Sequence, residues 1–289
     1  MTALRQRLIE DMQVRNYSPR TVEAYVAAVV KVTKHFMRAP DLLTSEELRA
    51  FQVHLLSAKT SWSQFNQIVC GLRFFYGTTL GRPEVVETLP YGKRPKVLPV
   101  VLSMEEVAQL LAAAKPGRER MLLETAYGCG LRISELLGLQ VTDIDASRMV
   151  LTVRHGKGAK DRQVPLSARL LSSLRCWWRT HRHGRWLFPG KTAARPLSDG
   201  NVQRIAGRVV KRAGLRKKAT LHTLRHSYAT HLLEAGVDVV TLQKLLGHSD
   251  LSTTARYLHL STRQMQKLPN VLDLLGLPKE EKKAEVKDA

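Results

Sequence analysis

The stretch His222-Thr-Leu-Arg225-His226 decides how the rest of this 289-residue chain is interpreted. His222 and Arg225 are three residues apart on a predicted helix, so both side chains project from one face. Together they offer a proton acceptor and a two-pronged clamp for a phosphate group. A surface histidine and arginine with no joint role would have the same spacing, so the neighbouring motifs must decide between the two interpretations.

The same stretch also allows a metal site, because His222 and His226 are four residues apart. No glutamate follows the first histidine, however, and no third ligand stands out. We therefore expect no metal. Asp143 and Asp145 suggest a carboxylate-metal nuclease, but they precede a predicted strand and lack a third partner. We interpret them as turn residues.

Two motifs follow in the last third of the chain, LLGH at 245–248 and ARYLH at 255–259. Tyr257 is expected on a helical segment that Ser252 caps. A lone tyrosine in such a place is normally a core residue with a satisfied hydroxyl. Its occurrence nine residues after His248 favours a shared site instead.

The upstream segment Gly130-Leu-Arg132-Ile-Ser-Glu135-Leu has an arginine directly after a glycine-bracketed turn. The apolar residues that follow would bury one helix flank and fix Arg132 near the helix start, where backbone N–H groups favour anions. Glu135 follows one turn later. It is either a residue on the solvent side or the group that holds a catalytic arginine or histidine in place, and the sequence favours neither.

Two β-prone runs, 149–153 and 163–166, flank a basic, glycine-rich segment and predict a hairpin. Lys157 at its tip is reachable, which suits a general acid for a leaving oxygen. A plain phosphate contact is the alternative role for Lys157. That plainer role is the one expected for Lys160 and Arg162.

A run of cations without a single acid extends from residue 204 to residue 218. Four of these cations share a face of the helix predicted from Asp199 to Ala213 and closed by Gly214. A merely solvated helix would usually interleave acids. We therefore expect this stripe to follow a DNA backbone. Its members are Arg204, Arg208, Lys211 and Arg212.

The whole chain is strongly basic, with 46 Lys and Arg against 25 Asp and Glu, a formal charge of +21 and a pI near 10.3. A polyanion is the expected partner, and a generally basic ribosomal or secreted protein is the alternative. The 44% of hydrophobic residues can bury one or two real cores. Three cysteines without metal-ligand spacing, and no uncharged run of membrane-spanning length, predict a soluble cytoplasmic protein.

The pattern divides the chain into two predicted domains. Residues 1–89 are expected to form a small helical domain, and residues 90–99 a linker that stays extended and solvated because of its three prolines, glycine and cations. Residues 100–277 are expected to form a mostly helical domain with the small hairpin, and residues 278–289 a disordered tail. Capping signals predict helix starts at Ser18-Pro19, Thr44-Ser-Glu-Glu47 and Ser103-Met-Glu-Glu106.

These motifs, in this order and approximate spacing, resemble the tyrosine recombinase (phage integrase) family, and its bacterial Xer-like and integron-like members most of all. The resemblance covers nearly the whole chain. Cys129 departs from the family, in which a threonine or another small residue is common there, and we expect no loss of chemistry from it. The resemblance rests on the segments around Arg132, Lys157, His222, Arg225, His248 and Tyr257, and more weakly on Ser18-Pro-Arg-Thr21 and Leu72-Arg-Phe-Phe-Tyr76.

The resemblance implies a mainly helical α+β fold, with a SAM-like core-binding domain and a catalytic domain that carries a small sheet. The two domains would close as a C-shaped clamp around duplex DNA, with Lys93 and Arg94 of the linker along that DNA. A tetramer on two synapsed duplexes is implied as well. The apolar segment Leu268–Gly276 would dock onto a neighbouring subunit, or equally onto its own domain.

For the chemistry, the resemblance implies that Tyr257 attacks the scissile phosphate, forms a 3'-phosphotyrosyl bond and frees a 5'-hydroxyl. No ATP or other cofactor is needed, because the covalent link keeps the energy. Arg132 and Arg225 would bind the non-bridging oxygens. Lys157 would protonate the leaving oxygen, His222 would take or share the tyrosine proton, and His248 would hydrogen-bond the phosphate.

Two alternative functions remain open at this point. The same chemistry in a single duplex would relax supercoils, as a type IB-like enzyme does, although the Xer-like helical N-terminal domain favours recombination. A DNA-binding regulator with an inactive site is the alternative from another class. The presence of every expected catalytic residue argues against that regulator.

Overall fold

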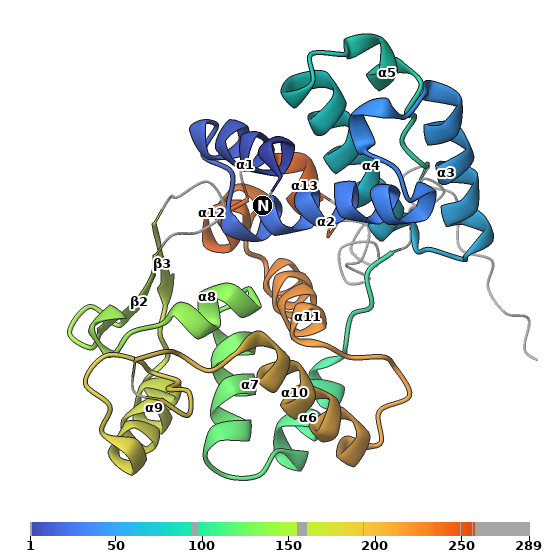
Figure 1. The fold of residues 1–289 in the computed structure, drawn as a ribbon. Coiled ribbons are helices and arrows are strands. Elements are labelled where there is room, and N and C mark those ends of the chain that lie inside the picture. The colour runs from blue at the N-terminus through green and yellow to red at the C-terminus, as the bar shows by residue number, and fades with distance from the viewer. Residues whose placement is uncertain are drawn as a thin grey trace, which may run out of the picture. The chain divides into compact units, whose positions relative to one another are not determined.

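The computed structural model describes residues 2–93, 98–154, 161–192, 194–248, 250–255 and 257. The chain divides into two compact units, Met1–Val97 and Leu98–Ala289, and each has a hydrophobic core of its own. Figure 1 colours the first unit blue to teal and the second unit green to orange. The fold is mainly helical with a small sheet, as the sequence predicted.

Unit 1 consists of helices joined by short turns (Figure 1). The close packing of α2 on α4 depends on a glycine, because a Cβ on Gly71 would lie 2.9 Å from the Ala28 Cβ. The elements are α1 (Ala3–Val14), α2 (Pro19–Phe36), the 3-10 turn η1 (Pro40–Leu42), α3 (Ser45–Ser57), α4 (Trp62–Phe74), the π-helical turn η2 (Phe75–Thr79) and α5 (Pro83–Glu87).

Residues 90–92 pack on unit 1, although their composition predicted a solvated linker. The side-chain amide of Asn66 donates to the Gly92 carbonyl at 3.0 Å, and its oxygen accepts from the Gly92 N–H at 2.8 Å. The Arg73 guanidinium lies over the Tyr91 ring, 4.9 Å from its centroid. The composition did not predict these contacts with α4, but Pro90 and Tyr91 are exposed, as expected for a solvated segment.

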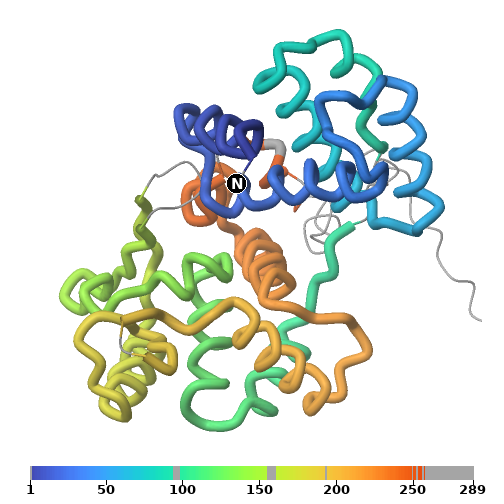
Figure 2. Tube along the Cα trace, in the orientation of Figure 1, coloured from blue at the N-terminus to red at the C-terminus, as the bar shows by residue number. Residues whose placement is uncertain are grey.

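The small sheet of unit 2 lies at one side of its helices (Figure 1), and Figure 2 follows the chain of this unit from the green segment to the orange helices. Its elements are α6 (Met104–Ala113), α7 (Arg118–Gly128), α8 (Ile133–Gly138), the 3-10 turn η3 (Val141–Asp143), β1 (Ile144–Asp145), β2 (Val150–Val153), β3 (Arg162–Pro165), α9 (Ala168–His181), α10 (Asp199–Ala213), α11 (Leu221–Glu234), α12 (Val239–Leu246) and α13 (Leu251–Ala255).

The three strands form an antiparallel sheet in the order β1-β2-β3. Leu151 pairs with Ile144 on one side and with Val164 on the other, and Val153 pairs with Arg162. The alternation buries Leu151, Val153 and Val164 in the core, as expected for strands with one covered face. The predicted hairpin is therefore confirmed, and the short β1 is an addition to it.

The predicted helix signals are confirmed at several positions. Ser18 caps α2, and capping boxes begin α3 at Thr44 and α6 at Ser103. Gly214 ends α10 in the left-handed conformation. The expectation for Ser252 was wrong, because α13 begins at Leu251 and residue 252 therefore lies inside the helix.

A second cluster in unit 2 lies between α11, α12 and the turn after α13. It is small, and its members include both aromatic and aliphatic side chains from sequence-distant elements: Tyr228, Ala229, Leu233, Leu242, Leu246 and Tyr257. This cluster fixes α12 and the turn after α13 against α11, which carries the motif around Arg225. Within the described ranges, no helix is long and apolar enough to cross a membrane.

Candidate active site

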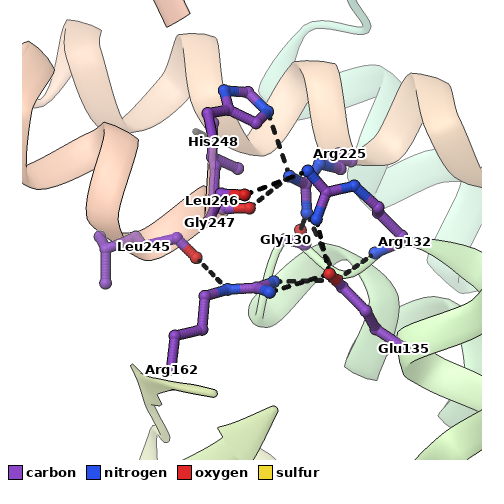
Figure 3. A network of polar contacts seen from close by, with 9 residues as sticks. All are labelled: Gly130, Arg132, Glu135, Arg162, Arg225, Leu245, Leu246, Gly247 and His248. Carbon is purple, nitrogen blue, oxygen red and sulfur yellow. Dashed lines mark hydrogen bonds and ion pairs between the residues drawn. The ribbon is translucent and has the colours of Figure 1, made fainter. Parts of the chain in front are cut away.

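Glu135 lies at the centre of a cluster of arginines in unit 2 (Figure 3). Its side chain is 3% exposed, and its oxygens accept hydrogen bonds from Arg132 Nη1 at 2.6 Å and from Arg162 Nη1 and Nη2, both at 2.8 Å. Arg225 Nη1 lies 3.5 Å from the same carboxylate. The sequence allowed Glu135 either to face solvent or to hold an arginine or histidine in place. In the structure its carboxylate faces the arginines.

The charge of Glu135 is stabilised by these contacts. Burial by itself would raise the pKa of the carboxyl, but the hydrogen bonds from Arg162 and from the backbone N–H of Arg132, together with the charges of Arg162 and Arg225, lower it to about 2. Three guanidinium groups thus surround one carboxylate, which leaves a local excess of positive charge. Such an excess favours the binding of an anion.

Arg225 is the most enclosed of the three arginines, with 1% of its side chain exposed. Its Nη1 donates to the Gly130 carbonyl and its Nη2 to the Leu246 carbonyl, both at 2.6 Å. Burial and the charge of Arg132 lower the pKa of this guanidinium to about 10, although Glu135 opposes the shift. Arg225 is therefore cationic at neutral pH and fixed between the end of α7 and the end of α12.

His248 follows the end of α12, and its Nε2 lies 3.2 Å from Arg225 Nη2 (Figure 3). A guanidinium can only donate, so Nε2 is the acceptor and the proton of the neutral ring is on Nδ1. Nδ1 lies 2.8 Å from Oγ1 of Thr254, a residue that is fully buried. The ring of His248 is thus oriented from both sides.

Tyr257 lies in a turn just beyond α13, not on a helix as expected. The residue is 2% exposed, and its hydroxyl is 2.8 Å from Nδ1 of His226. Its ring stacks on the ring of His248, with an angle of 11° between the planes and 6.4 Å between the centroids. The proposed nucleophile therefore lies within the same group of side chains as His248 and the arginines.

His226 is a residue of this site that the sequence analysis did not select. It was considered only as a metal ligand, yet its Nδ1 lies 2.8 Å from the Tyr257 hydroxyl. His222 packs edge-on against it, with 4.3 Å between the ring centroids. The spacing of four residues on α11, which suggested a metal, instead brings two imidazoles into contact. Among the described residues, no group of three or more His, Cys, Asp or Glu could hold a metal ion.

Arg132 and His222 both line one concavity of about 580 Å³. Its walls also include parts of α10 and of the segment that leads into α11. Arg132 is partly exposed and His222 is exposed, whereas Arg225 is buried. His222 and Arg225 therefore differ strongly in exposure, although the helical spacing predicted that they project from one face.

Arg162 does not have the exposed position that a phosphate contact requires. Its side chain is only 9% exposed. Besides its two bonds to Glu135, it donates from Nε to the Leu245 carbonyl at 2.7 Å.

Cys129, the departure from the family pattern, is fully buried, and burial raises the pKa of its thiol to about 12. That thiol is not reactive at neutral pH.

The basic stripe on α10 is exposed, but acids from α6 and α7 approach some of the cations between 204 and 218. Arg212 lies 3.0 Å from Glu119, and Arg208 lies 3.9 Å from it. Arg204 is exposed and contacts the Gly200 carbonyl and Asn201 on its own helix. Lys211 and Lys93 are exposed.

Some expectations fall on residues outside those that the structure describes. They concern Arg94, Lys157, Lys160, Leu268–Gly276 and 278–289.

Asp143 lies in the 3-10 turn η3, as predicted, but Asp145 is the last residue of β1, so the turn prediction was wrong for it. Asp143 accepts from the Gln140 N–H at 2.7 Å and pairs with Arg154. Asp145 accepts from the N–H groups of Ser147 and Arg148 and also pairs in the short β1. Neither carboxylate is directed to the arginine cluster.

Family models match both units of the chain. Residues 100–264 match the phage integrase family, and residues 4–84 match the N-terminal SAM-like domain of phage integrases. The integrase/recombinase y4qK of Sinorhizobium fredii is 44% identical over 96% of this chain and 91% of its own length. The tyrosine recombinase XerA of Thermococcus kodakarensis is 36% identical over 89% of this chain and 90% of its own length.

A lambda integrase dimer bound to a COC' core site has a similar fold, with a TM-score of 0.70 and 20% identity over 93% of this chain and 98% of that chain. The fold and the matches define a site-specific recombinase that uses a tyrosine. The chain belongs to the phage integrase family.

Proposed function

We propose that Tyr257 is the nucleophile with which this recombinase cuts and rejoins duplex DNA. Its hydroxyl oxygen attacks the scissile phosphorus, the bond to the 5' oxygen breaks, and a 3'-phosphotyrosyl link remains. The released 5'-hydroxyl later attacks the phosphotyrosyl bond on a partner strand. The observation that carries this proposal is the grouping of Tyr257 and His248 with two arginines around Glu135.

Arg132 and Arg225 are proposed to bind the two non-bridging oxygens of the phosphate. Both are already oriented before DNA binds, Arg132 by Glu135 and Arg225 by two backbone carbonyls. Preorganised donors of this kind stabilise the charge that grows in the transition state, by about 3 kcal/mol per donor. Lys157 is proposed to protonate the leaving 5' oxygen, as the family resemblance implies.

The two histidines of α11 are proposed to share the proton of the tyrosine. His226 contacts the hydroxyl at 2.8 Å, and His222 lies against the ring of His226 and on the wall of the concavity with Arg132. A proton from Tyr257 can thus pass to His226, with His222 beside the phosphate. His248 is proposed to hydrogen-bond the phosphate.

Duplex DNA is the proposed partner of both units, with residues 1–89 as the core-binding domain and 100–277 as the catalytic domain. The formal charge of +21 supports it, as does the similarity to an integrase that was solved on a core site. A homotetramer on two synapsed sites, and a cytoplasmic location, are proposed from the family resemblance. The described, exposed candidates for contacts with the DNA backbone are Lys93, Arg204, Arg208, Lys211 and Arg212.

The test uses a nicked suicide substrate made from the ends of the element in which the gene lies. Wild type and Tyr257→Phe are incubated with it, and an adduct that resists denaturation is sought by gel electrophoresis. We expect the adduct from wild type only, with equal binding of the substrate by both proteins. If neither protein forms an adduct on tightly bound DNA, the chain is a DNA-binding regulator and the proposal is wrong.

A further inference from the structure

Arg162 connects three parts of the site that are distant in sequence (Figure 3). It is the first residue of β3, two positions after the segment 155–160 that contains Lys157. Its Nη1 and Nη2 form two parallel bonds to Glu135, and its Nε donates to Leu245 near the end of α12. All three nitrogen atoms of the guanidinium therefore bind the protein.

The bonds to Glu135 affect the two arginines that are proposed to bind the phosphate. Glu135 also accepts from Arg132 and lies 3.5 Å from Arg225. Without Arg162, two acceptor positions on the carboxylate would be open. Arg132 and Arg225 would then turn further toward Glu135 and away from a phosphate, because a buried carboxylate requires donors.

The bond to Leu245 affects the turn that carries His248. The next two carbonyls, of Leu246 and Gly247, accept from Arg225 and Arg132. Gly247 leaves the space for Arg162, since a Cβ there would lie 3.1 Å from both Cδ and Nη1 of the arginine. Arg162 thus fixes the same turn whose carbonyls orient the phosphate-binding arginines.

We propose that Arg162 is a positioning residue for strand cleavage: it ties the hairpin to Glu135 and to the turn before His248, and so holds Arg132 and Arg225 in reactive positions. It acts through these groups and does not contact DNA. This inference rests on the proposed function of the site. It replaces the phosphate contact that the sequence suggested for Arg162.

The experiment measures two quantities for each variant: the single-turnover rate of adduct formation at saturating suicide substrate, and the dissociation constant for the same DNA. The variants are Arg162→Lys and Arg162→Met. A lysine keeps the charge but cannot form two parallel bonds to a carboxylate. We expect both variants to lower the rate by roughly 10- to 100-fold while the dissociation constant changes less than about 2-fold.

Arg154→Met is the matched control. Arg154 lies on the same hairpin and also pairs with a buried carboxylate, that of Asp143, but it has no bond to Glu135. Its loss removes one charge and one ion pair from the same region. We expect the rate and the dissociation constant of this variant to stay close to those of wild type.

A double variant separates positioning from a general loss of stability. If Arg162 acts in part through Glu135, then the loss of rate in the double variant Glu135→Gln with Arg162→Met should be clearly smaller than the product of the two single losses. Independent, multiplying losses would contradict the inference. A wild-type cleavage rate for both Arg162→Lys and Arg162→Met would also contradict it. Weaker DNA binding with a smaller salt dependence, at an unchanged cleavage rate, would contradict it as well, because that result is expected if Arg162 contacts a phosphate. An absence of adduct from wild type would instead refute the proposed function.

Discussion

Glu135 is the residue on which the arginine cluster depends most. Its carboxylate is buried and compensates part of the positive charge of three guanidinium groups. We expect Glu135→Gln to lower the free energy of unfolding by on the order of 3 kcal/mol at pH 7, because it leaves buried charges uncompensated. Urea denaturation checks this value, and a loss below about 1 kcal/mol would contradict the central role of the carboxylate.

The same residue predicts a pH dependence. The pKa of Glu135 is about 2 in the folded protein, below its ordinary value of 4.5. The contribution of the carboxylate to stability is therefore complete above about pH 4.5 and is lost as the pH falls toward 2. The difference in unfolding free energy between wild type and Glu135→Gln should be constant above pH 5 and shrink below pH 4.5. A difference that does not change with pH would be the contrary result.

At the residue scale, the sequence was informative where the chemistry is local. The motif residues Arg132, Arg225, His248 and Tyr257 were selected by type and spacing, and the structure brings them together around the arginine cluster. The sequence alone could not assign partners for Arg162, because Glu135 is 27 residues away and Leu245 is 83 residues away along the chain. A basic residue beside a hairpin looks the same in a sequence whether it binds DNA or a buried carboxylate.

At the scale of the elements, the turn between α7 and α8 controls the position of Arg225. Gly130 has a φ of +59°, and a Cβ there would lie 2.4 Å from Cδ1 of Tyr228. We expect Gly130→Ala to destabilise the protein by about 2 kcal/mol or more and to slow adduct formation, because the Gly130 carbonyl binds Arg225. Thermal unfolding and the adduct assay measure the two effects.

Gly138→Ala is the control for that substitution. Gly138 ends α8, and nothing lies within 4 Å of a Cβ built on it. We expect the unfolding temperature and the cleavage rate of the Gly138→Ala variant to match those of wild type. Equal losses in both variants would mean that the turn geometry at Gly130 has no special part in holding Arg225.

The stripe on α10 gives a second prediction at this scale. Arg204 and Lys211 are exposed, whereas Glu119 already compensates part of the charge of Arg208 and Arg212. Changing Arg204 and Lys211 to Gln should weaken DNA binding and reduce the slope of log affinity against log salt by about 2. Changing Arg208 and Arg212 to Gln should reduce it less. Fluorescence anisotropy at several salt concentrations compares them, and equal slopes would contradict the assignment.

The elements themselves could largely be predicted from local signals. Capping sequences gave the starts of α2, α3 and α6, and β-prone runs gave the hairpin. The remaining features depend on contacts that local signals do not contain. Gly92 bonds to Asn66 of α4, and α13 begins at Leu251 instead of after a cap at Ser252. Tyr257 lies in a turn, where its place is set by packing against α11 and α12 and not by helical periodicity.

At the scale of the whole molecule, the chain has two units with separate cores. Unit 1 buries its own aromatic and aliphatic side chains between α1, α2, α3 and α4, and residues 90–92 belong to it. We expect residues 1–97, expressed alone, to unfold cooperatively on heating, as an independent domain does. Circular dichroism checks this expectation. A gradual loss of helix signal without a transition would mean that unit 1 requires unit 2 to fold.

The most direct test of the central claim is to identify the bond between protein and DNA. The adduct from the suicide substrate is digested with protease, and the DNA-linked peptide is sequenced by mass spectrometry. We expect a peptide in which the hydroxyl oxygen of Tyr257 carries the 3'-phosphate of the cut strand, and a free 5'-hydroxyl on the released piece. A link through another residue, or to a 5'-phosphate, would contradict the account.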